Sequence, residues 1–166
     1  MNKSITLIGM AGAGKSTIGK QLAKLLDFKF LDGDLIIERR INQSIQNFLD
    51  QYGGKEFTKI EEEVLLAINF NKMILATGGS AVLSHTAMKF IRKESEVIFL
   101  DVTYENISKR ILNLSERGLV REPNQSLQET YNERLSLYRK YADHVVVNDG
   151  DIDSCLKKLI ALTKSF

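Results

Sequence analysis

The chain has 166 residues, of which 43% are hydrophobic and 27% are charged, and it holds one proline and eleven glycines. This length suits one domain with a core of its own, and the composition excludes a disordered or fibrous chain. The 23 Lys and Arg residues against 21 Asp and Glu residues give a net charge of +2. So small a surplus argues against a nucleic-acid-binding protein, because such proteins need a strongly basic face.

The sequence gives no indication of a disulfide, a metal cluster or a membrane-spanning segment. Cys155 is the single cysteine, and the two histidines, His85 and His144, have no metal-ligand partners near them in the sequence. The N-terminal apolar run is short and soon reaches glycines, so it lacks both a signal-peptide cleavage pattern and the roughly 20 apolar residues of a membrane span. We therefore expect a soluble, cytoplasmic protein without a membrane partner.

Apolar segments of strand length alternate with segments of helical period along the chain. The predicted strands cover residues 4–8, 29–31, 73–76, 97–102 and 144–147. The predicted helices cover residues 15–26, 35–42, 44–52, 56–70, 85–93, 104–114, 127–141 and 152–164. Because the strands are apolar throughout, we expect burial on both faces, as in a parallel sheet. The sequence predicts a three-layer α/β/α fold in a single domain of residues 1–166, with ligands beyond the carboxyl ends of the strands.

Residues 9–17, GMAGAGKST, contain the complete P-loop pattern G-x-x-x-x-G-K-[ST] between the first predicted strand and a helix. Backbone N–H groups of such a loop hold phosphate oxygens. The lysine reaches the β- and γ-phosphates, and the serine hydroxyl ligates Mg²⁺. A glycine-rich turn without a ligand is the alternative, and the full motif in this context outweighs it. The predicted nucleotide-binding residues in this segment are Gly12, Ala13, Gly14, Lys15, Ser16 and Thr17.

Nucleotide binding alone leaves kinases, GTPases and motor ATPases open. The sequence lacks the pattern N-K-x-D with which GTPases read the base, and it lacks the strand ending in Asp-Glu that is typical of motor ATPases. In a chain of 166 residues without an extra domain, a small-molecule kinase is the most economical interpretation.

Two carboxylates, Asp32 and Asp34, stand at the end of the second predicted strand, one residue apart. This spacing along an extended chain sends both side chains to the same side. One carboxylate could hold Mg²⁺ through water while the other faces the acceptor hydroxyl, since phosphoryl transfer needs charge neutralisation and an oriented nucleophile. The alternative is an Asp turn in which Asp34 caps the following helix.

With these features in place, the chain resembles the shikimate kinase family over most of its length. That family's pattern combines a P-loop, a strand ending in D-x-D, an F-R-x-x-E helix, T-G-G-G after the third strand, R-P-L in a lid, and a later R-x-x-x-Y. The matching residues here are Gly9 to Ser16, Asp32 and Asp34, Phe57-Thr58-Lys59-Ile60-Glu61, Thr77-Gly78-Gly79-Ser80, Arg117-Gly118-Leu119, and Arg134 with Tyr138. The resemblance implies a P-loop kinase fold with five parallel strands in the order 2-3-1-4-5 and a mobile lid at about residues 115–125. It also implies Mg²⁺-dependent transfer of the γ-phosphate of ATP to the 3-hydroxyl of shikimate.

The resemblance also implies roles for individual residues. It makes Lys15, Asp34 and Arg117 catalytic, with Asp34 bonding the acceptor hydroxyl and Arg117 reaching the phosphates from the lid. Ser16 and Asp32 belong to the metal site, and Arg110 packs on the adenine. The substrate-binding residues are Asp34, Thr58, Gly78, Gly79 and Arg134, and Glu61 matches the family's glutamate. From the residues alone, a solvated arginine on a helix is the more common interpretation of both Arg110 and Arg134, and it is the resemblance that favours a site role for Arg134.

The departures from the family pattern cluster around the acceptor site and the lid. Thr58 stands where the pattern has an arginine that binds the substrate carboxylate, Ser80 replaces its third glycine, and Gly118 replaces the lid proline. The P-loop and the acidic pair are intact. This distribution favours altered acceptor recognition over loss of catalysis, although ordinary variation within the family gives the same picture.

Three functions therefore remain open. The leading one is a shikimate kinase or a close relative. The second is a P-loop kinase for another small hydroxy compound, and the third is a nucleotide-binding protein that has lost catalysis. Retention of Lys15, Ser16, Asp32 and Asp34 counts against the third. We expect a monomer whose partners are ATP and a small hydroxy acid.

Overall fold

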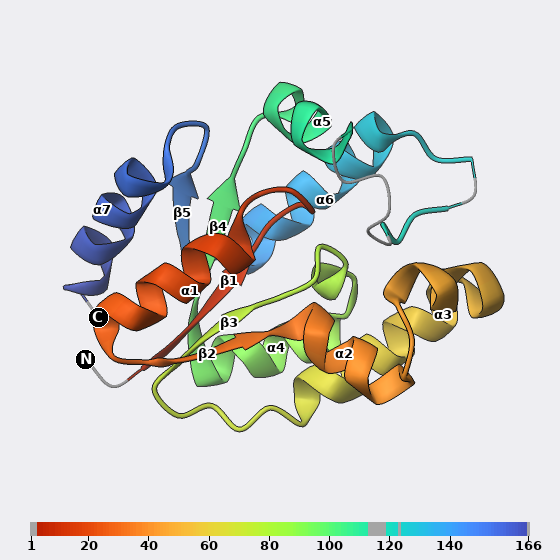
Figure 1. Ribbon diagram of the computed structural model, residues 1–166, viewed down its shortest axis with the longest axis horizontal. Coiled ribbons are helices and arrows are strands. Elements are labelled where there is room, and N and C mark those ends of the chain that lie inside the picture. Colours follow the sequence, from red (N-terminus) through yellow and green to blue (C-terminus); the bar gives the residue numbers. More distant parts are fainter. Residues whose placement is uncertain (1–2, 113–118, 123, 166) are drawn as a thin grey trace.

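The computed structural model describes residues 3–112, 119–122 and 124–165. Its centre is a five-stranded parallel sheet in the order β2-β3-β1-β4-β5 (Figure 1). The strands are β1 (Ser4–Ile8), β2 (Lys29–Asp32), β3 (Met73–Ala76), β4 (Ser95–Asp101) and β5 (His144–Val147). Within the described ranges, the predicted number, direction and order of strands are confirmed. β4 begins two residues before the predicted start and ends one residue before the predicted end.

Helices cover both faces of the sheet, as Figure 1 shows, with α1 and α7 in front and α4 and α6 behind. The helical elements are α1 (Lys15–Leu26), α2 (Gly33–Ile41), α3 (Ile45–Leu66), the 3₁₀ turn η1 (Ala81–Leu83), α4 (His85–Glu94), α5 (Tyr104–Leu112), α6 (Leu127–Tyr141) and α7 (Ile152–Thr163). The predicted α/β/α layers are therefore confirmed. None of the helices in the described segments is long and apolar enough to cross a membrane.

The element α3 consists of two helical parts that meet at a kink, as the sequence predicts with separate helices at residues 44–52 and 56–70, but it ends at Leu66, four residues before the predicted end. Its helical geometry is broken at Gly53, where φ is 77° and ψ is 172°. Positive φ is strained for residues with a Cβ, so glycine is the residue that lets the two helical parts meet at this kink.

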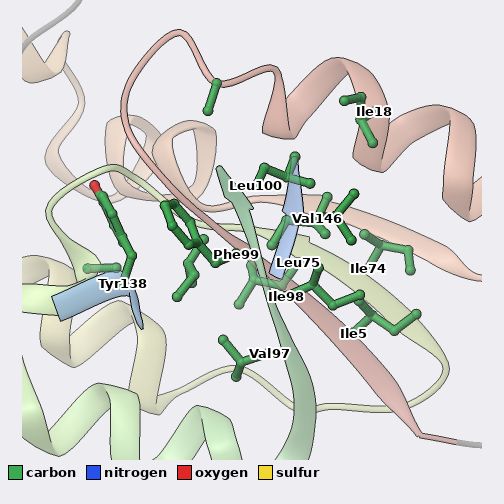
Figure 2. Close-up of a cluster of buried hydrophobic side chains, with 14 of the residues drawn as sticks. Ile5, Ile18, Ile74, Leu75, Val97, Ile98, Phe99, Leu100, Tyr138 and Val146 are labelled. Atoms are coloured by element: carbon green, nitrogen blue, oxygen red, sulfur yellow. The ribbon is translucent and has the colours of Figure 1, made fainter. Parts of the chain in front are cut away.

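The main core lies on both faces of the central strands. Every residue of β1 and β3 is buried. This fits the apolar sequence of β3, and the buried hydroxyls of Ser4 and Thr6 in β1 are hydrogen-bonded to the backbone N–H of Met73 and to Ser95. Figure 2 shows part of this cluster, in which Ile18 of α1 and Tyr138 of α6 approach the strands from different helices. The ring of Tyr138 stacks on Phe99 of β4 with 5.1 Å between ring centroids. This packing fixes α6 against the sheet.

A second, smaller apolar cluster joins α2, α3 and the segment 119–122. Its buried members are Ile37, Ile45, Phe48, Phe57, Val64 and Val120. Val120 is 8% exposed and therefore ties the segment before α6 to the kinked helix α3. The cluster thus packs α3 against α2 and against the segment 119–122.

Candidate functional site

The loop after β1 has the backbone shape of a phosphate-binding loop. Gly14, with φ 88° and ψ 10°, precedes the first residue of α1. Gly9 has φ 146°, and a Cβ built on it would lie 2.8 Å from the backbone oxygen of Leu100. Glycine is required at both positions, and the N-terminus of α1 faces the loop with N–H groups available for an anion.

Lys15 is buried at the start of α1, and its ammonium lies inside the loop. Its Nζ donates hydrogen bonds to the backbone oxygens of Gly9, at 2.7 Å, and Met10, at 2.8 Å. Burial lowers the pKa of Lys15 to about 8, against the attraction of Asp34 and Asp32. The side chain therefore remains mostly charged at neutral pH, as a phosphate-binding lysine requires.

Ser16 and Asp32 meet at the end of β2. The Ser16 hydroxyl donates to Asp32 Oδ2 at 2.5 Å, and Asp32 Oδ1 accepts from the backbone N–H groups of Asp34 and Leu35. Asp32 is therefore the residue that caps α2, and the alternative in which Asp34 caps it is wrong. The helix accordingly begins at Gly33 rather than at the predicted residue 35.

The pair formed by Ser16 and Asp32 suits Mg²⁺. Magnesium prefers oxygen ligands and takes one or two from the protein, with the rest from phosphates and water. A hydroxyl and a carboxylate beside the P-loop supply this donor set. Among the described residues, no cluster of three or more His, Cys, Asp or Glu side chains could hold a metal.

Two carboxylates lie close to Gly78, which follows β3. A Cβ built on Gly78 would lie 2.6 Å from Asp34 Oδ1 and 2.7 Å from Glu61 Oε1. Any side chain at this position would therefore collide with both carboxylates. The glycine lets Asp34 from α2 and Glu61 from α3 approach the same point.

Glu61 is 1% exposed and accepts a hydrogen bond of 2.6 Å from the Ser80 hydroxyl at Oε2. Burial raises the pKa of Glu61 to about 7, and the charge of Asp34 adds to this, while the bond from Ser80 and the charges of Arg134 and Lys15 oppose it. Oε1 has no hydrogen-bond partner among the described residues. Glu61 was matched to the family's glutamate but not predicted as a site residue. The sequence does hold a signal for Glu61 as a site residue: it is acidic, and it lies one turn from Phe57 and from Val64 on the buried side of α3.

Arg134 of α6 is 2% exposed and lies beside Gly79. Its Nη2 donates to the backbone oxygen of Val120, whereas Nε and Nη1 are buried and have no hydrogen-bond partner in the described chain. A Cβ built on Gly79 would lie 3.7 Å from Nη1. Leaving buried charged donors unpaired is costly, so this guanidinium is poised for an anionic ligand.

A single cavity of about 430 Å³ brings most of these groups together. Predicted site residues that line it are Gly12, Gly14, Lys15, Ser16, Thr17, Asp34, Gly79, Arg110 and Arg134, together with Ser80. A larger groove of about 970 Å³ lies beside β2 and the end of α3, but it is lined by none of the predicted phosphate-binding residues. The P-loop cavity is therefore the candidate active site.

Thr58 lies in a neighbouring cavity of about 640 Å³, which shares Leu119, Val120 and Arg134 with the first. Its hydroxyl donates to the backbone oxygen of Gly54 at 2.8 Å. The hydroxyl is thus engaged within α3, and Thr58 lines this neighbouring cavity rather than the P-loop cavity.

Arg110 lies on the outer side of the P-loop. It donates to the backbone oxygens of Gly12 and Asn148, each at 3.2 Å. The Asn148 side chain donates to the backbone oxygen of Ala13 at 2.8 Å. Asn148, which directly follows β5, therefore supports the backbone of the P-loop. Arg117 and Gly118 lie outside the described residues, as does most of the predicted lid.

Comparisons with known proteins agree with this geometry. The family model described as "Shikimate kinase" matches residues 11–163. The shikimate kinase of Francisella tularensis subsp. novicida (strain U112) is 40% identical over 152 residues, which cover 89% of this chain and 86% of that protein. The structure of a shikimate kinase from Acinetobacter baumannii in complex with shikimate is 31% identical, with a TM-score of 0.88, and covers 98% of this chain and 93% of that one. The shikimate kinase from Aquifex aeolicus gives a TM-score of 0.82 at 29% identity, with 97% and 96% covered.

Proposed function

This chain belongs to the shikimate kinase family, and we propose that it transfers the γ-phosphoryl group of ATP to the 3-hydroxyl of shikimate. As a family member it is a phosphotransferase with an alcohol group as acceptor.

One observation carries the choice of acceptor. The cavity that contains the P-loop also contains the buried guanidinium of Arg134, whose Nε and Nη1 have no protein partner in the described segments. A carboxylate fits this need, because Arg–carboxylate hydrogen bonds are charge-assisted and can be bidentate. An acceptor with both a carboxylate and a hydroxyl can therefore bind Arg134 while its hydroxyl lies in the same cavity as the P-loop.

The nucleotide side uses the P-loop. Backbone N–H groups of Gly12, Ala13 and Gly14, with those of Ser16 and Thr17 at the helix start, hold the phosphates. Lys15 turns its ammonium from the loop oxygens to the transferring phosphoryl group. Ser16 and Asp32 hold Mg²⁺, which neutralises phosphate charge when it is bound.

The acceptor side uses Asp34 and the two glycines after β3. The hydroxyl oxygen of shikimate attacks the γ-phosphorus, the bond from that phosphorus to the β–γ bridging oxygen breaks, and the hydroxyl proton passes to Asp34. The products are ADP and shikimate 3-phosphate. Asp34 is exposed at the start of α2 and is accessible for this role, while Gly78 and Gly79 let the acceptor approach the backbone.

Two further arginines and the lid act on the nucleotide. Arg110 lies where adenine packs, and Arg117 reaches the phosphates from a lid formed by residues 115–125. The lid excludes water when it closes and so limits hydrolysis of ATP. The enzyme acts as a monomer in the cytoplasm, and its single domain needs no partner chain for the reaction.

A coupled assay of ADP release tests the proposal against a panel of acceptors. We expect shikimate to give the highest kcat/KM among shikimate, quinate, gluconate and neutral sugars. A neutral sugar as the best acceptor, or no acceptor-dependent ADP release, would contradict it. Removing Mg²⁺ with a chelator should abolish turnover, because the triphosphate then loses its main neutralising charge.

A further inference from the structure

Asn148, the first residue after β5, contacts the P-loop through a buried side chain. Its Nδ2 donates a hydrogen bond of 2.8 Å to the backbone oxygen of Ala13. The same nitrogen lies 3.2 Å from a Cβ built on Gly14, so the amide packs against the peptide unit that joins these two residues. Asn148 is 5% exposed, and a side-chain amide buried to this extent needs such a partner.

The backbone of Asn148 is itself held in place. Its N–H donates to the backbone oxygen of Asp101, at the end of β4, at 2.8 Å. Its own backbone oxygen accepts from Nη2 of Arg110 at 3.2 Å. The next residue, Asp149, accepts a hydrogen bond of 2.8 Å from Nδ2 of Asn106 on α5. These bonds fix the position of Asn148 relative to the sheet and to α5.

The bond to Ala13 determines where the following N–H group points. A peptide unit is planar, and in the trans form its C=O and N–H point in opposite directions. Asn148 holds the C=O of Ala13 on the outer side of the loop, so the N–H of Gly14, in the same peptide unit, points to the opposite side. Gly14 lines the P-loop cavity, and backbone N–H groups that face such a cavity bind anions.

We propose that Asn148 is a positioning residue of the phosphate site, which turns the N–H of Gly14 toward the phosphates of ATP by holding the carbonyl of Ala13. Asn148 acts on the binding of the phosphate chain and not on recognition of the base. This inference rests on the proposed function, since it assumes that the P-loop holds the phosphates of ATP.

The physical reason is the freedom of the peptide unit between Ala13 and Gly14. Glycine has a wide range of backbone dihedral angles, so this unit can rotate once the bond from Asn148 is lost. A donor that is oriented before the ligand arrives binds more tightly than one that must first be ordered. Loss of the amide therefore weakens the binding of every ligand that places a phosphate against Gly14.

The test measures the affinity of two ligands by isothermal titration calorimetry in the presence of Mg²⁺. One ligand is ATP, and the other is tripolyphosphate, which has the phosphate chain without the base. In Asn148→Ala, both ligands should bind about five- to tenfold more weakly than to the wild-type protein, because one neutral hydrogen bond is lost. The KM for ATP should rise by the same factor, and the KM for shikimate should not change.

Two outcomes of this comparison would overturn the proposal. Unchanged affinities in Asn148→Ala would show that the bond to Ala13 does not support phosphate binding. Weaker binding of ATP alone, with normal binding of tripolyphosphate, would show that Asn148 acts on the base.

Asn148→Leu separates the hydrogen bond from packing. Leucine has the same branching at Cγ as asparagine and no donor, and the change adds no charge. It should weaken both ligands as much as Asn148→Ala does, and it takes the place of that variant if Asn148→Ala does not fold. Wild-type affinity in Asn148→Leu would show that packing alone holds the loop, and would refute the role of the amide.

Asn106→Ala is the matched control, because Asn106 is an asparagine of α5 whose amide makes a bond of the same 2.8 Å length to Asp149. Its loss should lower thermal stability and leave both affinities at the wild-type value. Equal weakening in Asn106→Ala would show that any loosened contact between α5 and the loop after β5 has this effect, which would defeat the specific role of Asn148.

The same titrations distinguish the two levels of the argument. Wild-type protein that binds neither ATP nor tripolyphosphate would refute the proposed phosphate site, and this inference with it. Wild-type protein that binds both ligands, together with unchanged affinities in the Asn148 variants, would refute only the role of Asn148.

Discussion

Lys15 has a buried side chain that lines the phosphate cavity, and its ammonium donates hydrogen bonds to two backbone oxygens of the loop. Lys15→Ala should therefore abolish turnover without collapsing the core. The loss should be at least about a thousandfold in kcat, because a charge aimed at the transferring group acts in a site that excludes water. ADP release and thermal unfolding by circular dichroism measure the two effects.

Lys20→Ala provides the control for that experiment, since Lys20 is exposed on the same helix. It should retain wild-type kinetics. A folded Lys15→Ala enzyme with near-normal activity would end the assignment of the phosphate site.

In the proposed function Arg134 is the main cation for the acceptor carboxylate, because Thr58 stands where the family pattern has a second arginine. Thr58→Arg should lower the KM for shikimate by about tenfold, because a charge-assisted hydrogen bond contributes roughly 1.5–3 kcal/mol and 1.4 kcal/mol is a factor of ten. The KM for ATP should stay within about twofold, since Thr58 does not line the P-loop cavity. An unchanged KM for shikimate in an enzyme that uses shikimate would show that position 58 does not face the bound acid.

Among elements, α3 owes its shape to Gly53. With φ at 77° and no atom within 4 Å of a built Cβ, Gly53→Ala strains the backbone without causing a collision. Left-handed geometry costs a residue with a Cβ about 1–2 kcal/mol, so we expect a destabilisation of that size in urea unfolding. Gly150→Ala, equally open but without positive φ, should be close to neutral. Equal stability of the two variants would contradict strain at the kink.

The segment before α6 is the element predicted to close over ATP. In the described residues, Val120 packs in the apolar cluster with Phe57 and accepts a hydrogen bond from Arg134. Hydrogen exchange of peptides that span residues 115–125 should slow when an ATP analogue binds, because closure shields the backbone. Equal protection with and without the analogue would contradict a lid.

Elements that depend on a short stretch of sequence could be predicted, whereas those that depend on contacts between distant segments could not. The P-loop and the position of Asp32 follow from short motifs, so they were predicted. The break at Gly53 was located by the gap between two helical periods, but the sequence could not tell a kink from a loop. The strand order came from the family resemblance, since the pairing of parallel strands depends on long-range contacts that periodicity does not encode.

The same limit applies to the site. Glu61 becomes recognisable when α3 crosses the carboxyl edge of the sheet and brings it to Gly78 and Ser80. Thr58 was predicted beside the substrate because of its place in a family motif, and its bond to the backbone oxygen of Gly54, four residues earlier, is a local bond that a threonine within a helix can make. The position of Glu61, by contrast, depends on the tertiary packing of the kinked helix.

At the scale of the whole molecule, Glu61 links the site to stability. Its pKa rises from an ordinary 4.5 to about 7 on folding, so the folded state holds the proton more tightly than the unfolded state. Stability from this group is present below about pH 4.5 and is lost as pH rises through about 7. The free energy of unfolding of Glu61→Gln minus that of the wild type should increase by about 3 kcal/mol across this window. A difference that stays constant between these pH values in urea unfolding would contradict the raised pKa.

The central claim is that the P-loop cavity phosphorylates the 3-hydroxyl of shikimate, and phosphorus–proton correlation NMR of the product tests it most directly. The account predicts one new phosphomonoester, coupled to the proton on C3 of shikimate and formed in equal amount with ADP. Phosphate esterified at another position, or ADP formed with free phosphate alone in the presence of shikimate, would contradict the account.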